Sequence, residues 1–295
     1  GLLRHRARDL AAGGFDQVTL RARSASLDPT EARIVLEGDV QLVPAQRLVL
    51  DAPVLESDGG SAQLSAAYIR LGTPENINPS AALPVSAGLG SLRVRGQQVD
   101  ILGTLALRGF GPGAGATGTD DTAPVLIESD GDIRFIGGKR ISDDGFHTTG
   151  RLVSGADVTL RADQVYAATA TDFTLTVHGD AGKITILPGG ASQAPLSAGS
   201  RLTLTAANIE QLGTLRAPFG QIDLDARETL VLGAGSLTSV SGAGQMVPFG
   251  TTEFGGQDWL YPVADGHSNV YQAPPEKRVT LTAPQVTLAP GSVVD

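Results

Sequence analysis

Four stretches of this chain share one pattern, a short apolar strand followed by another apolar position seven residues after the strand begins. The strands begin at Leu92, Val158, Leu202 and Val279, and the later apolar positions are Val99, Val165, Ile209 and Val286. Two copies also share the letters LGTL at the same later offset, at 102–105 and 212–215. Such repeats indicate a solenoid, in which each coil contacts only its neighbours. A chain of 295 residues therefore needs no single large core.

Apolar and polar residues alternate in many short segments, such as 18–20, 133–135 and 184–186. Alternation in valine, isoleucine, threonine and leucine is typical of half-buried strands, and convincing helical periodicity is rare. From Leu202 the pattern recurs at Ile222 and reaches Gly242, which gives rungs of about 20 residues. We therefore predict an all-β fold, a parallel β-helix that forms one shaft over 1–295, with strands about 4.8 Å apart. The residues expected to point inward are Leu202, Leu204, Ile209, Leu212 and Leu215.

Segments rich in glycine, proline or acidic residues interrupt the ladder, and loops of a solenoid vary in length where its rungs do not. The predicted excursions are 73–90, 109–121, 137–155, 188–199 and 242–278. The last one separates two rungs, because the pattern stops at Gly242 and resumes at Val279.

Charge and composition exclude several classes of function. The net charge of −9 argues against nucleic acid as a partner, since its binders carry basic stripes, and against docking on an anionic membrane surface. The chain has no cysteine, which excludes disulfides, thiolate zinc sites and a cysteine nucleophile. No apolar run approaches the length of a membrane span. No cofactor or metal is expected.

Three patterns that can carry chemistry are better explained without it. The glycines at 113–118 match G-x-G-x-x-G, but no helical segment follows, so a surface loop is expected. The acidic pairs at 120–121 and 143–144 lie in glycine-rich stretches and are expected to be solvated turns, although flanking carboxylates can act as acid and base or hold calcium. The four histidines lie far apart and lack metal-ligand spacing; they are His5, His147, His178 and His267.

The excursion at 242–278 is rich in aromatic residues in a chain that has few of them. It contains the only tryptophan and the only methionine. Tryptophan and tyrosine stack on sugars or pack on partners, so these residues form a possible ligand-contact loop. The alternative, which we favour, is a small core that holds the loop against the shaft. The candidate residues are Phe249, Phe254, Trp259, Tyr261 and Tyr271.

Several stretches resemble large bacterial exoproteins of the filamentous haemagglutinin type. The resemblance rests on LGTLRAPFGQIDLDA at 212–226, LVLGAGSLTSVSGAG at 230–244, VYAATATDFT at 165–174 and PPEKR leading into VTLTA at 274–283. It implies a right-handed β-helical shaft that is exported through the Sec pathway and then an outer-membrane β-barrel transporter, by two-partner secretion. It also implies an extracellular or cell-surface location and roles in adhesion, aggregation or biofilm formation, without catalytic residues. The family's N-terminal secretion domain is not evident, so we expect an interior piece of the shaft.

Three functions remain open. The leading hypothesis is a non-enzymatic adhesin shaft that attaches to a glycan or protein on host or bacterial surfaces. The second is a carbohydrate-active β-helix enzyme or polysaccharide-binding module, which requires acidic side chains that converge on one outer face beside basic and aromatic residues. The third is a stalk subunit of a multi-chain fibre or surface layer, which self-associates through the ends of its coil.

Overall fold

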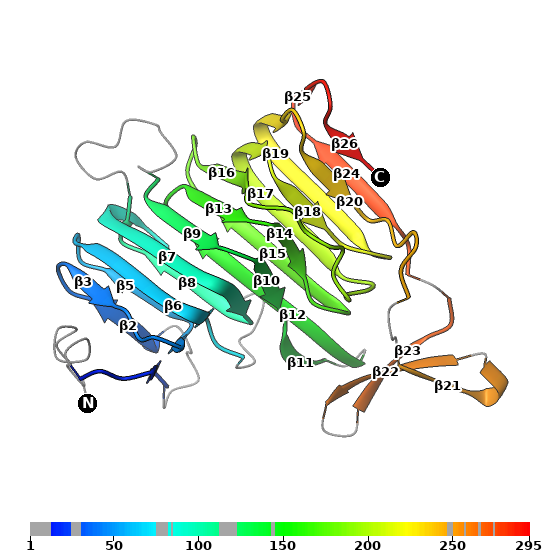
Figure 1. The fold of residues 1–295 in the computed structure, drawn as a ribbon, viewed down its shortest axis with the longest axis horizontal. Helices are drawn as coiled ribbons and strands as arrows, with labels where there is room; N and C mark the ends of the chain where they lie inside the picture. The colour runs from blue at the N-terminus through cyan, green and yellow to red at the C-terminus, as the bar shows by residue number, and fades with distance from the viewer. Residues whose placement is uncertain are drawn as a thin grey trace.

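The computed structural model describes residues 13–24, 31–74, 82–83, 85–111, 123–142, 145–246, 250–256, 258–264, 267–273 and 275–295. They form a coil of short parallel strands, stacked side by side from the N-terminal end to the C-terminal end (Figure 1). The fold is all-β and is a parallel β-helix, as predicted. Within the described ranges, no helix has the length and apolar character needed to cross a membrane.

Each full coil has three sides, and each side is a stack of parallel strands. Several long strands turn a corner and serve two sides. Side one consists of β3 (Val40–Leu42), the first parts of β6 (Ser61–Leu71) and β7 (Ala87–Leu102), β9 (Val125–Ser129), β13 (Val158–Ala162), β16 (Lys183–Pro188), the second parts of β17 (Arg201–Gln211) and β19 (Gln221–Leu232), and β25 (Gln285–Leu288).

Side two follows side one along the chain. It consists of β1 (Gln17–Arg21), β4 (Arg47–Asp51), the second parts of β6 and β7, β10 (Asp132–Ile136), β14 (Gln164–Ala167), β18 (Thr214–Arg216), β20 (Leu237–Ser239) and β26 (Val293–Val294). Side three consists of β2 (Arg33–Leu36), β5 (Val54–Ser57), β8 (Thr104–Arg108), the second part of β12 (Gly145–Ser154), β15 (Thr171–Val177), the first parts of β17 and β19, and β24 (Arg278–Thr282).

Inward side chains from the three sides fill the centre of the coil in columns. On side three, leucines pair rung by rung from β8 to β19; they are Leu105, Leu152, Leu175, Leu204 and Leu224. Each of these is at most 1% exposed. The column forms because alternate residues of a strand face the core, and the parallel register places each inward residue beside an inward residue of the next strand. Of the residues predicted to point inward, Leu212 is half-buried at a corner, and the other four are buried.

The rungs are regular only in part. Leu202 pairs with Ile222, which lies twenty residues later, and this confirms the predicted period for β17 and β19. Val99 pairs with Ile133, thirty-four residues later, because an excursion lies between them. Ile222 pairs with Val279, so the coil resumes directly after the excursion at 242–278.

Two of the predicted excursions replace a strand. Side three has no strand between β5 and β8, and side two has none between β14 and β18. At these two positions the chain follows the segments predicted as excursions, 73–90 and 188–199, in place of a strand. The range 109–121 lies between β8 and β9, and its residues 112–121 lie outside the described residues.

The remaining two excursions leave the coil at the corner between sides two and three. In the range 137–155, β11 (Gly138–Ser142) and the first part of β12 form an antiparallel hairpin. Parallel pairing with the coil begins inside the predicted excursion, at Thr148 against β15 and at Arg151 against β8, because β12 continues into side three. In the range 242–278, the chain forms a separate three-stranded sheet of β21 (Thr251–Glu253), β22 (Asp258–Ala264) and β23 (His267–Tyr271).

Candidate functional site

The three-stranded sheet β21–β23 stands outside the stacked coil and carries the aromatic residues that the sequence singles out (Figure 1). Its strands are antiparallel, unlike those of the coil, and β23 contacts β12. A 3₁₀ turn, η3 (Phe254–Gly256), joins β21 to β22. The sheet is therefore a second structural element on the shaft, held at one corner.

Three of the five candidate aromatics share one face of this sheet. Trp259 lies directly opposite Tyr271, and Tyr261 lies two residues along β22, so the alternation of strands puts all three on the same side. Trp259 is 40% exposed, and both tyrosines are half-buried. Phe249 lies outside the described residues, and Phe254 lies in η3, where only its backbone is described.

The opposite face of the sheet carries aliphatic and acidic residues. Leu260 pairs with Val270, which is 56% exposed, and Glu253 pairs with Asp258. Aromatic residues are thus concentrated on one face. We call that face, made by Trp259, Tyr261 and Tyr271, the aromatic face.

A second cluster, which the sequence did not predict, lies on the outer surface of side two. Outward side chains from successive rungs meet there and form a network that we call the polar ladder. Its members are Tyr68, Gln98, Asp100, Asp132, Arg134, Gln164 and Tyr166. Parallel register places Asp100 beside Arg134, and Arg134 beside Tyr166, on neighbouring strands.

Asp100 is the centre of the polar ladder. Its carboxylate accepts two hydrogen bonds from the guanidinium of Arg134, at 2.8 Å from Nε and 2.7 Å from Nη2. It also accepts a hydrogen bond from the hydroxyl of Tyr68 at 2.8 Å and one from Nε2 of Gln98 at 3.2 Å. The residue is 1% exposed although it faces outward. A carboxylate this buried is stabilised only because charged and polar donors surround it.

The titration behaviour of the polar ladder follows from burial. Burial, followed by the hydrogen bond to Asp100, raises the pKa of Tyr68 to about 12. Burial, followed by the charge of Asp132, raises the pKa of Tyr166 to about 12. Hydrogen bonding to Asp100 is the main cause that raises the pKa of Arg134. The pKa of Asp132 is also raised, mainly by burial, although Gln164 and Tyr166 donate hydrogen bonds that lower it. Both tyrosines and the arginine therefore keep their protons at neutral pH.

The segment 189–199 lies against the polar ladder at β14, where side two lacks a strand. Nε2 of Gln164 donates to the carbonyl oxygen of Gln193 at 2.8 Å, and the hydroxyl of Ser197 donates to the carbonyl oxygen of Ala167 at 2.8 Å. Nε2 of Gln245 donates to Ala194 at 3.0 Å. This segment therefore crosses side two over β14, from the end of β16 to the start of β17.

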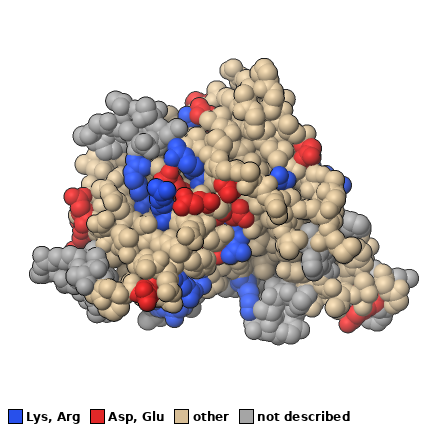
Figure 2. Space-filling model, viewed as in Figure 1, with Lys and Arg blue, Asp and Glu red and all other residues tan. Residues whose placement is uncertain are grey.

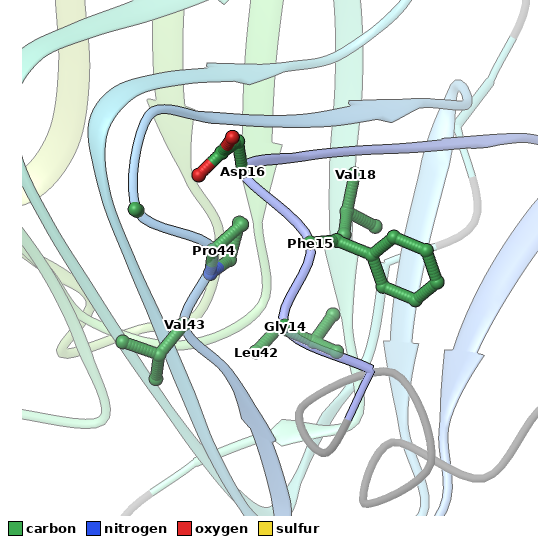
Figure 3. A pocket seen from close by; sticks show the side chains of 8 residues that line it. Gly14, Phe15, Asp16, Val18, Leu42, Val43 and Pro44 are labelled. Carbon is green, nitrogen blue, oxygen red and sulfur yellow. The ribbon is translucent and has the colours of Figure 1, made fainter.

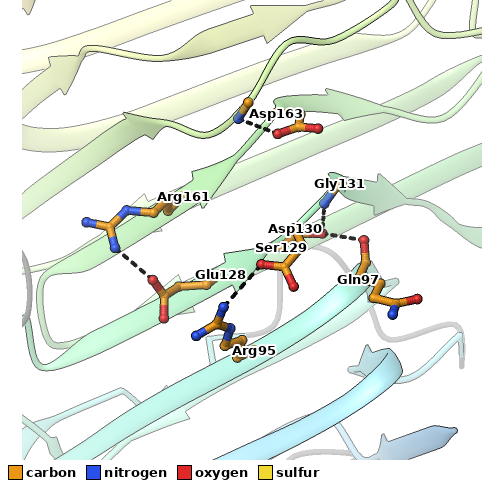
Figure 4. A network of polar contacts seen from close by, with 9 residues as sticks. Arg95, Gln97, Glu128, Ser129, Asp130, Gly131, Arg161 and Asp163 are labelled. Atoms are coloured by element: carbon orange, nitrogen blue, oxygen red, sulfur yellow. Dashed lines mark hydrogen bonds and ion pairs between the residues drawn. The ribbon is translucent and has the colours of Figure 1, made fainter.

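Side one carries a different arrangement, a row of ion pairs between strands. Figure 2 shows acidic and basic side chains gathered near the middle of the visible face. Glu128 accepts from Nη1 of Arg161 at 2.8 Å, and Asp130 pairs with Nη2 of Arg95 at 3.4 Å (Figure 4). The side chains of Arg95 and Asp130 are 67% and 61% exposed. The exposed pair of Arg95 and Asp130 stabilises the fold only slightly. Both pairs link neighbouring rungs of the shaft.

A small hollow of about 190 Å³ opens near the N-terminal end of the coil (Figure 3). Its lining includes Phe15, Val18, Leu42 and Val43, and Asp16 is its only acidic residue. Phe15 and Val43 are about half exposed. An apolar hollow with one carboxylate lacks the convergent polar groups that a specific small-molecule site needs.

The other patterns noted in the sequence do not assemble into a site. The glycine motif at 113–118, the acidic pairs at 120–121 and 143–144, and His5 lie outside the described residues. His178 directly follows β15 of the coil, whereas His267 begins β23 of the separate three-stranded sheet. Within the described ranges, no group of three potential ligands is placed to hold a metal ion.

Chemically, the aromatic face suits binding, because it offers flat apolar area. In the polar ladder, Tyr68, Gln98 and Arg134 already donate to Asp100, so the network first stabilises the stack of rungs. Comparisons with protein-family models, with curated proteins and with solved structures found no match. The resemblance to haemagglutinin-type exoproteins accordingly stays a hypothesis.

Proposed function

We propose that this chain is part of a non-enzymatic, secreted surface shaft that attaches a bacterial cell to a glycan or protein partner. The coil supplies length and rigidity, and the β21–β23 sheet supplies the contact. The observation that carries the proposal is the aromatic face, which stands on an element outside the parallel stack. Export through an outer-membrane β-barrel transporter and a location at the cell surface are parts of the same proposal, supported by the resemblance.

The chemistry of the aromatic face supports a role in attachment. Trp259 exposes 40% of its surface beside two tyrosines on the same face. Trp and Tyr dominate the energetics of protein interfaces because they bury a large area at low entropic cost. They also stack on sugar rings through their flat faces. A cluster of aromatic residues that includes an exposed tryptophan is typical of a binding surface.

The experiment compares two double variants of the purified chain in binding to bacterial and epithelial cells and to a glycan array. Trp259→Ala with Tyr271→Ala removes the aromatic face, and Leu260→Ala with Val270→Ala is the matched control on the opposite face. We expect the first to lose at least tenfold in binding and the control to keep it. Equal binding by both variants and the unchanged protein refutes the proposal.

Thermal unfolding of the same variants separates attachment from a purely structural role. If the aromatics only hold the sheet against the shaft, Trp259→Ala with Tyr271→Ala lowers the unfolding temperature and the binding change follows the loss of folded protein. If the aromatic face binds a partner, binding falls while the coil unfolds at an unchanged temperature.

A carbohydrate-cleaving enzyme is the second candidate function. It is favoured by one observation, that the carboxylates of Asp100 and Asp132 lie on one outer face beside Arg134, Tyr68 and Tyr166. Against it, Asp100 is held in a bidentate ion pair, which leaves it unsuited to proton transfer. Release of reducing ends from acidic polysaccharides, abolished by Asp132→Asn, supports the enzyme; its absence across pH 4–9 supports a shaft that only binds.

A further inference from the structure

The segment 189–199, which we call the strap, crosses the outer surface of side two over β14 without forming a strand. At its two ends, the N–H groups of Gly189 and Gly199 donate to backbone carbonyl oxygens of the coil at 2.8 and 3.0 Å. Between them, residues 190–197 form no backbone-to-backbone hydrogen bond with the part of the coil that the structure describes. The middle of the strap therefore depends on side chains for its position.

Two glutamines hold the middle of the strap. Nε2 of Gln164 donates to the carbonyl oxygen of Gln193 at 2.8 Å, and Nε2 of Gln245 donates to that of Ala194 at 3.0 Å. The Oε1 atom of each of these two side-chain amides is buried without a hydrogen-bond partner among the described residues. A buried acceptor without a donor is unfavourable, so the closed strap is less stable than the number of its bonds suggests.

Apolar contacts add little to this hold. Leu196, the only leucine of the strap, is 74% exposed. The residues of the strap that are buried are small; they are Pro195, Ser197 and Ala198. Segments with few buried apolar contacts open locally at a lower free energy than the core. We therefore expect the strap to open while the coil stays folded.

The same clamp connects the strap to the half-buried carboxylate of Asp132. Nε2 of Gln164, which holds the strap, also donates to Oδ2 of Asp132 at 3.2 Å. No residue of the strap carries a charge, so the strap adds cover near this carboxylate without supplying a cation. Burial is the main cause that raises the pKa of Asp132.

Charged and titratable groups also act on Asp132 from the neighbouring elements. The charge of Arg134 on β10 and a hydrogen bond from Tyr166 on β14 lower its pKa. The negative charge of Asp163, just before β14, raises it, and Asp163 also accepts a hydrogen bond from a strap N–H. Asp100 on β7 is paired with Arg134. Burial outweighs the two lowering effects, so removing cover stabilises the charged form of Asp132.

We propose that the strap is a pH-sensitive lid over β14, which opens when the two glutamines release its carbonyl groups and opens more readily once Asp132 is ionised. An open strap lets water reach the carboxylate, and water stabilises its charged form. By linkage, the protonated carboxylate favours the closed strap, and closure weakens as the pH rises above the ordinary aspartate range. Opening uncovers Gln164 and Tyr166 on the outer surface of β14. The lid operates independently of the aromatic face and of any role in attachment.

The experiment follows opening of the strap through one introduced thiol in the full chain, which has no cysteine of its own. Ser197→Cys places the thiol at a strap position that is 2% exposed. Its rate of labelling by a pyridyl disulfide is divided by that of free cysteine at the same pH, which removes the effect of thiol ionisation. Ala226→Cys, at a position on β19 that is also 2% exposed, reports opening or unfolding of the coil itself.

Two substitutions, each with a matched control, are then added to Ser197→Cys. Asp132→Asn removes the titrating group, and Asp130→Asn removes an exposed carboxylate two residues away. Gln245→Ala removes one clamp amide, and Gln63→Ala removes an exposed amide from side one. The same four substitutions in Ala226→Cys detect any variant that loosens the coil.

We expect Ser197→Cys to label faster than Ala226→Cys, and its relative rate to rise about fivefold or more between pH 4.5 and pH 8. Asp132→Asn should abolish this rise and Asp130→Asn should keep it. Gln245→Ala should raise the relative rate at every pH, and Gln63→Ala should not. The proposal is overturned by a relative rate that does not change with pH, by a rise that persists in Asp132→Asn, by no effect of Gln245→Ala, or by equal labelling at the two cysteine positions.

Discussion

Replacing Phe173 by alanine removes one half of an aromatic pair at the centre of the coil. The rings of Phe173 and Phe135 stack at 4.6 Å between centroids, with an angle of 29° between their planes, and both residues are fully buried. Phe173 belongs to side three and Phe135 to side two, so the pair joins two sides across a corner.

The cost of this substitution can be estimated from its surroundings. Removing a buried phenylalanine side chain costs about 3–5 kcal/mol, and a stacked pair adds about 0.5–1.5 kcal/mol beyond area alone. The register partner of Phe173 on β12 is Gly150, which has no side chain to fill the space. We therefore expect a loss of about 4–5 kcal/mol, at the upper end of the range.

Urea unfolding followed by far-ultraviolet circular dichroism measures this loss. The matched control is Phe15→Ala, because Phe15 is 52% exposed and its removal should cost less than about 1 kcal/mol. A loss below about 1.5 kcal/mol for Phe173→Ala, or equal losses in both variants, refutes the packing that we describe.

Two further substitutions test the polar groups. The raised pKa of Asp132 means that the folded chain holds its proton more tightly than the unfolded chain. Protonated Asp132 therefore stabilises the fold below the ordinary aspartate pKa, and this stabilisation is lost as the pH rises through the raised pKa. Asp132→Asn should raise the urea midpoint at pH 7 and leave it unchanged near pH 3. A lower midpoint at pH 7 contradicts this. Gln211 is fully buried and bonds to the backbone of Gly213 and Leu237, at 3.1–3.2 Å and 2.9 Å. Gln211→Leu should cost about 1–3 kcal/mol for each backbone group left unpaired, and a stabilised variant would show that these bonds contribute nothing.

The repeat in the sequence predicts the strands but not their places in the coil. The copies that begin at Leu92 and Val158 run from side one to side two, whereas those that begin at Leu202 and Val279 run from side three to side one. The pattern describes a strand, a corner and the next strand, which any two adjacent sides share. Gly103 has a φ of 63° in its LGTL segment, and Gly213 does not, because the two segments occupy different corners.

The polar ladder could not be predicted because its members come from rungs of unequal length. Asp100 and Tyr68 are separated by 32 residues, and Asp100 and Arg134 by 34. Only the register of the folded strands shows that these positions coincide. The β21–β23 sheet did have a signal, the alternation of Trp259 and Tyr261, which is typical of a strand with one aromatic face.

The most direct test of the parallel β-helix is a disulfide between rungs on either side of the last excursion. The chain has no cysteine, so introduced pairs are unambiguous. Asp223 and Thr280 are register partners on β19 and β24, about 4.8 Å apart, within the range that a disulfide spans. Thr203 lies one further rung away, about 9.6 Å from Thr280, which is too far. We predict that Asp223→Cys with Thr280→Cys forms a disulfide on mild oxidation and that Thr203→Cys with Thr280→Cys does not. Bridging in the second pair, or in neither, contradicts the account.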